Sequence, residues 1–369
     1  MNRVPFVNLN KEYTSIKKEI NAAIGNVFSN SSFILGPSVS AFEKEFAQIC
    51  GVKYCVGVNC GTSALHLALI ALGIGPGDEV ITVPNSFVST TDAISYTGAL
   101  PVFVDIEKDT FNIDVDRIKS SITQKTKALL PVHLYGHSAD MESVLNIARE
   151  HNLVVIEDAC QSHNAKYKGK KVGSLGNIAC FSFYPSKNLG AYGCAGCVTT
   201  NDGQLAEKIH MLRNHGQPKK YYHNLIGYNY VMDGIQGAVL STKLKYLNKW
   251  TKKRRGLAQL YNKLLDGIPN IILPIEKDYA YHVYHLYVIR VLENRDKLKE
   301  YLRKKGIETG IHYPIPIHLQ KSYSFLNIGS GSFPISESYA NEIISLPLHH
   351  SLTKRQIKYV ANTIKNFPN

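Results

Sequence analysis

The sequence predicts an α/β fold in which a mostly parallel sheet is covered by helices. Two observations carry this prediction. Short apolar segments of strand length alternate with helical apolar spacing between residues 54 and 158, which is the rhythm of a doubly wound sheet. The segment LVVIED at residues 153–158 is apolar until it ends in two carboxylates, as expected of a strand buried on both faces.

The individual elements follow from periodicity and from turn residues. The predicted strands lie at residues 54–58, 79–83, 101–105, 128–132, 153–158 and 284–291. The predicted helices lie within residues 11–30, 38–50, 65–72, 115–122, 141–150, 203–214, 236–266, 297–305 and 354–364. The segment at 215–235 is polar, aromatic and rich in glycine, and an irregular segment of that length is usually functional or mobile.

A chain of 369 residues is long enough for two domains with sizeable cores. The composition turns to Pro, Ile and Asn around residues 267–278. We predict a large domain over residues 1–250 and a smaller α+β domain over 251–369. Apolar runs are too short to cross a bilayer, and the first residues lack the apolar core of a signal peptide, so we expect a cytoplasmic protein.

The net charge of +13 raises the possibility of nucleic-acid binding. The Lys and Arg residues are spread along the chain, however, and the dense runs at 252–255 and 303–305 fall in helical patterns. A cationic site for a small molecule that carries a pyrophosphate explains the charge equally well. The seven scattered cysteines argue against a disulfide framework, and the CxxC at Cys194 and Cys197 has no second pair, so we expect no metal.

The turn NCGTSA at residues 59–64 joins a strand to a helix and is a candidate anion site. Free backbone N–H groups and the positive end of the helix dipole point the same way at such a turn. Gly61 allows close approach, and Thr62 and Ser63 add hydroxyl groups. An ordinary helix N-cap is the alternative, since Ser and Thr are favoured there in any case.

Lys187 lies in the segment FSFYPSKNLGAYGCAG, residues 181–196, after a short aromatic strand. In uncharged, glycine-lined surroundings desolvation disfavours the ammonium form, and the amine becomes a usable nucleophile. Amines of this kind form Schiff bases with carbonyl compounds and with pyridoxal phosphate (PLP). A lysine that points into water at the end of a strand is the alternative, and this segment alone does not decide between them.

Asp158 ends the buried strand, at the edge of the sheet where ligands bind in α/β proteins. A PLP enzyme needs a carboxylate against the pyridine nitrogen, so that the ring can accept electrons. The pair Glu157 and Asp158 alone is more often structural. The occurrence of Asp158 together with Gln161, Ser182 and Lys187 favours a cofactor site. Phe87 is either a core residue or an aromatic side chain that stacks on a planar ring.

Taken together, the motifs resemble those of fold-type I PLP enzymes, and more narrowly those of the DegT/StrS-type nucleotide-sugar aminotransferases. The resemblance covers nearly the whole chain. Its motifs are GPGDEVITVPNSF, PVFVDIE, PVHLYG, VIEDACQSH, FSFYPSKNLGAYG, LRNHG, GYN, DGIQGAVL, YHLYVIR, IHYPIPIH and SLPLHH.

The resemblance implies a role for each of several residues. Lys187 would hold PLP and later shuttle a proton, and Asp158 would pair with the pyridine nitrogen. Cofactor binding would further involve Gly61, Thr62, Ser63, Phe87, Gln161 and Ser182, together with Asn229, which would reach the cofactor of the neighbouring subunit in a homodimer with shared active sites. The sugar or nucleotide side would be lined by Tyr184, His312 and Tyr313.

The motif sequences PVHLYG, DGIQGAVL and KYLNKW are similar to those of enzymes that aminate carbon 3 of a dTDP-linked 3-keto-6-deoxyhexose. The resemblance therefore implies a 3-aminotransferase of deoxyamino sugar biosynthesis that uses glutamate as amino donor. Amination of a 4-keto sugar is the alternative. A sugar dehydratase of the same family would carry histidine in place of Lys187, and nothing resembles an added helix-turn-helix domain of a regulator.

Three positions depart from the family pattern. Asn164 replaces a usual glycine, Cys194 replaces a usual aspartate, and Val231 replaces a usual arginine. The usual aspartate at position 194 and the usual arginine at position 231 are both absent. We therefore hypothesise that an ion pair has been lost between the lysine loop, residues 181–196, and the 215–235 segment.

Overall fold

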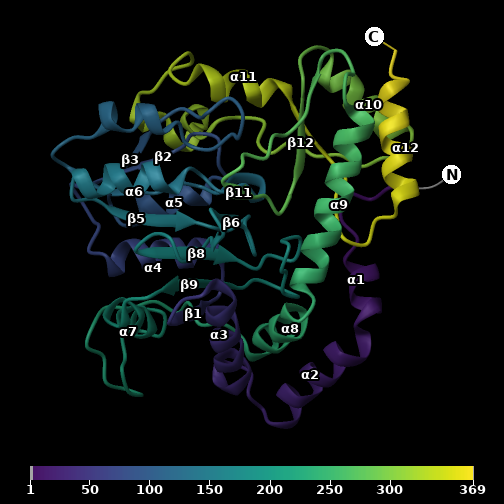
Figure 1. Cartoon of the computed structure of the whole chain (residues 1–369). Helices are drawn as coiled ribbons and strands as arrows, with labels where there is room; N and C mark the ends of the chain where they lie inside the picture. The colour runs from purple at the N-terminus through teal and green to yellow at the C-terminus, as the bar shows by residue number, and fades with distance from the viewer. Residues whose placement is uncertain (1–2, 369) are drawn as a thin grey trace.

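The structure, a computed structural model, describes residues 3–368 and is built on a central sheet (Figure 1). Within these residues seven strands form the sheet in the order β1-β9-β8-β5-β4-β2-β3. Its strands are β1 (Tyr54–Val58), β2 (Glu79–Thr82), β3 (Leu100–Phe103), β4 (Thr126–Leu129), β5 (Val154–Asp158), β8 (Ile178–Ser182) and β9 (Gly196–Thr200). All neighbouring pairs are parallel except those of β9, which is antiparallel to β1 and to β8. The predicted α/β fold with a mostly parallel sheet is confirmed.

Helices surround this sheet and continue into the C-terminal part. They are α1 (Leu9–Ser15), α2 (Lys17–Ser29), α3 (Gly36–Cys50), α4 (Gly61–Ala71), α5 (Ser89–Tyr96), α6 (Met141–Glu150), α7 (Gly203–Leu212), α8 (Gly234–Leu244), α9 (Leu247–Leu265), α10 (Arg295–Lys304), α11 (Pro334–Glu342) and α12 (Lys354–Lys365). Helices of ordinary length gain most of their stability by packing an apolar face, and these do so against the sheet or against one another.

Both faces of the sheet are covered, which explains why its strands read as apolar runs. In β8, Ile178 and Cys180 pack into a cluster with α4, α6 and α7. The alternating residues Ala179 and Phe181 pack into a second cluster with α3 and α8. Polar side chains that can meet a ligand are therefore expected at the strand ends and in the loops that follow them.

The C-terminal part has its own small sheet and core. The strands β10 (Ile271–Ile272), β12 (Tyr287–Val291) and β13 (Ile343–Leu346) form a three-stranded sheet. The long helix α9 leads into this part, which lies at the right of the molecule in Figure 1. Val4 pairs with Ile307 and is buried in the same core, so the start of the chain packs on the C-terminal part. A domain boundary at residue 250 stays a prediction.

The predicted elements agree best with the structure where their apolar pattern is strong. Helix α6 has the predicted bounds of residues 141–150. The helix predicted at 115–122 is instead two 3-10 turns, Val115–Arg117 and Lys119–Ser121, with the buried Ile118 between them. Strand β13, helix α11 and the antiparallel β9 were not predicted. A further sheet joins β11 (Ala280–Tyr281) to β6 (Lys166–Tyr167) and β7 (Lys170–Lys171).

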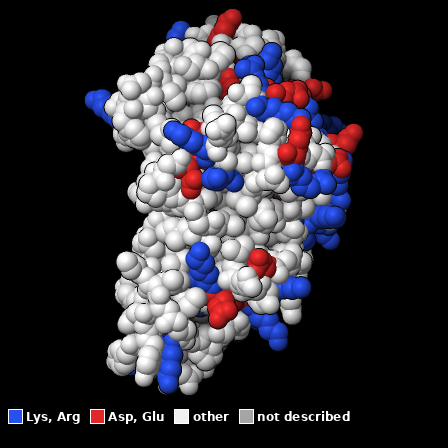
Figure 2. All heavy atoms as spheres, turned by 90° about the vertical axis from the view of Figure 1, so that its left-hand side faces the viewer, with Lys and Arg blue, Asp and Glu red and all other residues white. Residues whose placement is uncertain are grey.

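Charged side chains are mixed on the face shown in Figure 2. Lys and Arg lie between Asp and Glu there, and large areas carry neither sign. The net charge of +13 is therefore not gathered into one basic surface on this face. Among residues 3–368, no helix combines the length and the apolar character that a membrane span requires.

Candidate active site

A cavity of about 470 Å³ opens at the carboxyl ends of the parallel strands, where ligands bind in α/β proteins. The loops and helix starts that follow β1, β2, β5 and β8 all contribute to its wall. Ten of the predicted site residues border it, namely Gly61, Thr62, Phe87, Asp158, Gln161, Ser182, Tyr184, Lys187, His312 and Tyr313. The structure therefore brings together groups that are 252 positions apart in the sequence, from Gly61 to Tyr313.

Two predicted residues lie elsewhere. Ser63 is buried behind the cavity wall, where its hydroxyl lies 3.2 Å from Cys60 Sγ. Cys60, not Ser or Thr, is the N-cap of α4, because its sulfur accepts the Ser63 backbone N–H at 3.3 Å. The Ser63 hydroxyl therefore does not face a ligand in this cavity. Asn229 is exposed and pairs through its backbone with Asn214, away from the cavity of its own chain.

Lys187 follows β8 and borders the cavity. Its backbone N–H donates to Tyr184 O at 2.8 Å and fixes the turn. Burial lowers the pKa of the Lys187 amine, although Cys160 and Asp158 oppose this shift. No carboxylate of residues 3–368 lies within 4.0 Å of its nitrogen. The amine is therefore biased toward the neutral, nucleophilic form.

Asp158 ends β5 with its carboxylate facing the cavity and its residue almost fully buried. The Thr90 hydroxyl donates to its Oδ2 at 2.7 Å, and the Cys160 backbone N–H donates to its Oδ1 at 3.1 Å. Ser86 lies 2.7 Å from the Thr90 hydroxyl and extends this chain of hydrogen bonds. The orientation of Asp158 is therefore fixed before any ligand binds.

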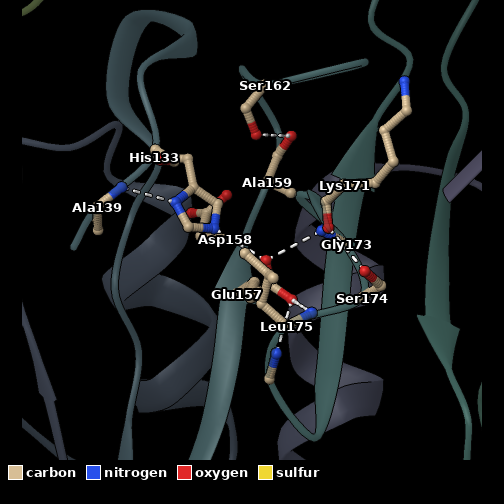
Figure 3. Close-up of polar contacts among 12 residues, drawn as sticks. His133, Ala139, Glu157, Asp158, Ala159, Ser162, Lys171, Gly173, Ser174 and Leu175 are labelled. Carbon is tan, nitrogen blue, oxygen red and sulfur yellow. Dashed lines mark hydrogen bonds and ion pairs between the residues drawn. The ribbon is translucent and has the colours of Figure 1, made fainter. Parts of the chain in front are cut away.

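Glu157, the neighbouring carboxylate, points to the opposite side of β5 and has a structural role (Figure 3). It accepts backbone N–H groups of Gly173, Leu175 and Gly176 at 2.8–2.9 Å. His133 Nδ1 accepts the Ala139 N–H, so the ring is neutral with its proton on Nε2, which donates to Glu157 at 3.0 Å. Of the two strand-end carboxylates, Glu157 is thus saturated while Asp158 borders the cavity.

Gln161 and Tyr313 join the region of the seven-stranded sheet to the C-terminal part across the cavity. Gln161 Oε1 accepts the Tyr135 N–H at 2.8 Å, and its Nε2 donates to Tyr313 Oη at 3.2 Å. The ring of Tyr313 lies 5.6 Å from that of Phe87, which is half exposed at the rim. Burial and the charge of Lys187 lower the pKa of His312 to about 4, so this ring is neutral at pH 7.

The starts of α4 and α5 meet at one end of the cavity. The Thr62 hydroxyl donates to Ser89 Oγ at 2.9 Å, and both residues border the cavity together with Ser182. A side-chain carbon added at Gly61 would lie 2.7 Å from Ser182 Cβ, so only glycine allows this close approach. Two helix N-termini with three hydroxyl groups suit a phosphate.

The residues present fit PLP, because the phosphate cradle, the Asp158 carboxylate and the Lys187 amine share one cavity. Sequence reasoning missed Ser89, Thr90 and Ser86 at this site. Their signal was the run of hydroxyl side chains after a strand, NSFVSTT, which reads equally well as a simple helix start.

The three departures have separate outcomes. Asn164 has φ +72°, in the left-handed region that glycine adopts without strain. This backbone conformation explains why glycine is usual at this position. The Asn164 amide compensates by donating to Asn248 at 3.0 Å and to Thr251 at 3.2 Å. Val58 pairs with Gly196 on one side and with Val231 on the other, so a strand separates the lysine loop from residue 231 within one chain. The hypothesis of an ion pair lost between positions 194 and 231 stays a prediction.

Comparison with known proteins gives consistent matches over the whole chain. The model of the DegT/DnrJ/EryC1/StrS aminotransferase family matches residues 14–365. A Geobacillus stearothermophilus protein named pleiotropic regulatory protein is 45% identical, covering 99% of this chain and 98% of its own. The dTDP-3-amino-3,6-dideoxy-alpha-D-galactopyranose transaminase of Aneurinibacillus thermoaerophilus is also 45% identical, covering 99% of each chain.

The solved structures agree with this result. The crystal structure of Streptomyces venezuelae DesV in complex with a ketimine intermediate superimposes with a TM-score of 0.97 at 42% identity. The match covers 99% of this chain and 98% of that one. The expected fold of a PLP aminotransferase is therefore confirmed.

Proposed function

Since the chain belongs to the DegT/DnrJ/EryC1/StrS aminotransferase family, whose aminotransferases depend on PLP, we propose that it aminates a nucleotide-linked keto sugar. The substrate we propose is a dTDP-linked 3-keto-6-deoxyhexose, with glutamate as amino donor and the 3-amino sugar as product. The observation that carries this proposal is the shared cavity of Lys187 and Asp158. A lysine and a carboxylate on opposite sides of the molecule would have excluded it.

When bound, PLP supplies an aldehyde for covalent attachment and a ring that accepts the electrons of a carbanion. Lys187 Nζ is the residue that would hold the cofactor, and it would afterwards take up and return the proton of the reacting carbon. Asp158 would keep the ring nitrogen protonated, and Thr90 and Cys160 N–H keep that carboxylate in place. Gly61, Thr62, Ser89 and Ser182 would hold the phosphate.

The rim of the cavity supports the assignment of a sugar or nucleotide to its open side. Tyr184 and Phe87 are both more than half exposed there. Tyr313 borders the cavity beside Phe87, with the two rings 5.6 Å apart. His312 also borders the cavity, and its Nδ1 lies 2.8 Å from Ser345 Oγ. Neutral rings and hydroxyl groups suit the hydroxyls of a sugar better than a charged wall would.

Amination at carbon 3 is favoured over carbon 4. Relatives at 42–45% identity over nearly the whole chain carry names of dTDP-3-amino sugar transaminases.

We propose that the active form is a homodimer with shared sites. Asn229 lies outside the cavity of its own chain and is exposed, as a residue that serves a neighbour's site must be. The segment around it presents Tyr221, Tyr222 and Ile226, the last of them 96% exposed. Light scattering tests the dimer, and mixing Asn229→Ala with Lys187→Ala subunits tests the sharing. One intact site in the mixed dimer would restore activity that neither variant has alone.

The central experiment is incubation of the enzyme with glutamate, PLP and a panel of dTDP- and UDP-linked 3-keto and 4-keto sugars. NMR of the product locates the new carbon–nitrogen bond, and we expect it at carbon 3 of the dTDP-linked 6-deoxy sugar. Failure to aminate any keto sugar would contradict the proposal and would favour a regulatory role, as in the name of the Geobacillus relative.

A further inference from the structure

Arg254 of α9 borders the inner wall of the cavity and is only 6% exposed. Its Nη1 donates to Leu348 O at 2.7 Å and lies 3.3 Å and 3.4 Å from Tyr284 O and His285 O. All three acceptors are backbone carbonyls. Among residues 3–368 no carboxylate lies within 4.0 Å of this guanidinium. Burial lowers the pKa of Arg254, and the charge that opposes this shift is that of Glu12, which is already paired with Lys243.

Nitrogen atoms without partners gather around this charge. Arg254 Nε, His285 Nδ1 and His349 Nε2 are buried and make no hydrogen bond within residues 3–368. All three side chains border the same cavity. Other unpartnered nitrogens occur among residues 3–368, but these three border one cavity, which indicates that an acceptor is missing there. A neighbouring arginine shows the contrast, because Arg255 pairs with Glu276 at 2.6 Å.

The missing acceptor has the chemistry of a carboxylate. A guanidinium is a planar fork that matches the two oxygens of a carboxylate, and a buried one needs an anion. Burial lowers the pKa of His349 to about 4 and that of His285 well below its usual value. Each ring is therefore neutral and has one N–H to donate. One permanent cation beside two neutral donors suits a single negative charge better than a pyrophosphate.

We propose that Arg254, supported by His285 and His349, binds a carboxylate of the amino-acid donor. This inference rests on the proposed transamination and names the binding site of its donor. The apolar side chains of Leu346 and Leu348 line the cavity beside the cluster and would shield the ion pair from water. Because Lys187 borders the same cavity, an amino acid anchored at Arg254 could present its amine where the reaction takes place.

The test measures binding of glutarate, a dicarboxylate without an amine, to the PLP-loaded enzyme by calorimetry. Arg254→Met should weaken glutarate binding and raise the KM for glutamate by about 10- to 100-fold, the loss expected for a charged hydrogen bond. Arg254→Lys should restore part of both, and the affinity for dTDP should not change. The control Lys252→Met alters an exposed residue on the same helix and should leave every value unchanged.

His349→Phe provides a second variant in which the carbonyl contacts of Arg254 remain, and we expect weaker glutarate binding at an unchanged melting temperature. If the variants weaken dTDP and spare glutarate, the anion is a pyrophosphate and the proposal is wrong. If the variants lower the melting temperature and leave the binding of both ligands unchanged, the proposal is also wrong. Arg254 would then serve only to hold α9 against the backbone carbonyls that it contacts. A wild-type enzyme that binds glutarate but aminates no sugar would contradict the proposed function instead.

Discussion

Two lysines meet at one loop, Lys187 as part of it and Lys243 from α8, and they differ in what surrounds them. Lys243 of α8 is fully buried and forms an ion pair with Glu12 at 2.6 Å. It also donates to Gly190 O at 2.6 Å and lies 4.1 Å from the centre of the Tyr192 ring. Lys187, three residues before Gly190, has no such partner among residues 3–368 and faces the cavity.

The difference shows that burial alone does not make a lysine reactive. Burial lowers the pKa of both amines, but Glu12 opposes the shift at Lys243 through its charge and a hydrogen bond. Lys243 is therefore held as a cation, with its donors occupied by the N-terminal helix and the lysine loop. That loop is tight, because a side-chain carbon at Gly190 would lie 2.2 Å from Pro185 O. Lys243, which is paired with Glu12, thus stabilises the loop that carries Lys187.

The largest effect is expected from Lys187→Ala. Turnover should fall by more than about 10³-fold, because acid–base catalysis alone contributes about 10²–10⁴ and the attachment point is also lost. The visible absorption of the bound cofactor should disappear. The free energy of unfolding of the cofactor-free protein should change by less than about 1 kcal/mol, since no ion pair is broken. Continued amination by this variant would show that Lys187 is not the catalytic lysine.

Lys243→Met should reduce the stability of the fold, whereas Lys187→Ala should abolish turnover and leave the stability almost unchanged. The Lys243→Met change leaves the Glu12 carboxylate buried without its partner, which costs about 3–5 kcal/mol of unfolding free energy. Urea denaturation measures the loss, and Lys245→Met, at an exposed position two residues further on, is the control. The double variant Lys243→Met, Glu12→Leu should recover much of the loss, since an apolar pair can replace a buried ion pair. Unchanged stability of the single variant would mean that the pair is not formed.

A smaller effect concerns His350, whose Nε2 lies 3.7 Å from Glu12 and whose ring stacks on Trp250. Burial, Arg254, His349 and two lysines lower its pKa to about 2. The unfolded chain therefore binds a proton below pH 6.5 that the folded protein does not, and stability falls as the pH decreases. Between pH 7 and 5 this histidine should account for up to about 2 kcal/mol. Denaturation of His350→Phe should show a shallower pH dependence, and equal slopes would contradict the assignment.

The smallest effect concerns Asn164, whose side-chain oxygen accepts a hydrogen bond from a third lysine, Lys171. Asn164→Gly should lose about 1 kcal/mol per hydrogen bond, while the relief of the left-handed backbone returns roughly 1 kcal/mol. Asn164→Ala loses the same bonds and keeps the strain, so it should be the less stable of the two by about 1 kcal/mol. Denaturation of both variants checks this order. An alanine variant as stable as the glycine variant would show that the backbone is not strained.

The sequence by itself determined the α/β fold and predicted which residues form the centre of the candidate site. Apolar alternation is a local signal, and it located β5 and α6 within a residue or two. Asp158 and Lys187 were identified because each follows a recognisable strand, and Gly61 because it opens a helix after another. In a parallel sheet the carboxyl ends of strands meet at one edge, so local placement was enough to bring these residues together.

Only the tertiary structure decided which polar groups have partners. Nothing near Lys243 in the sequence indicates Glu12, and nothing near Arg254 indicates His285 or His349. The side chain of Ser63 turned away from the cavity because Cys60 caps the helix. Pairing, desolvation and cavity lining depend on segments far apart in the chain that meet after folding, and a local pattern holds no record of them. The electrostatic character of each buried group is therefore a property of the folded structure.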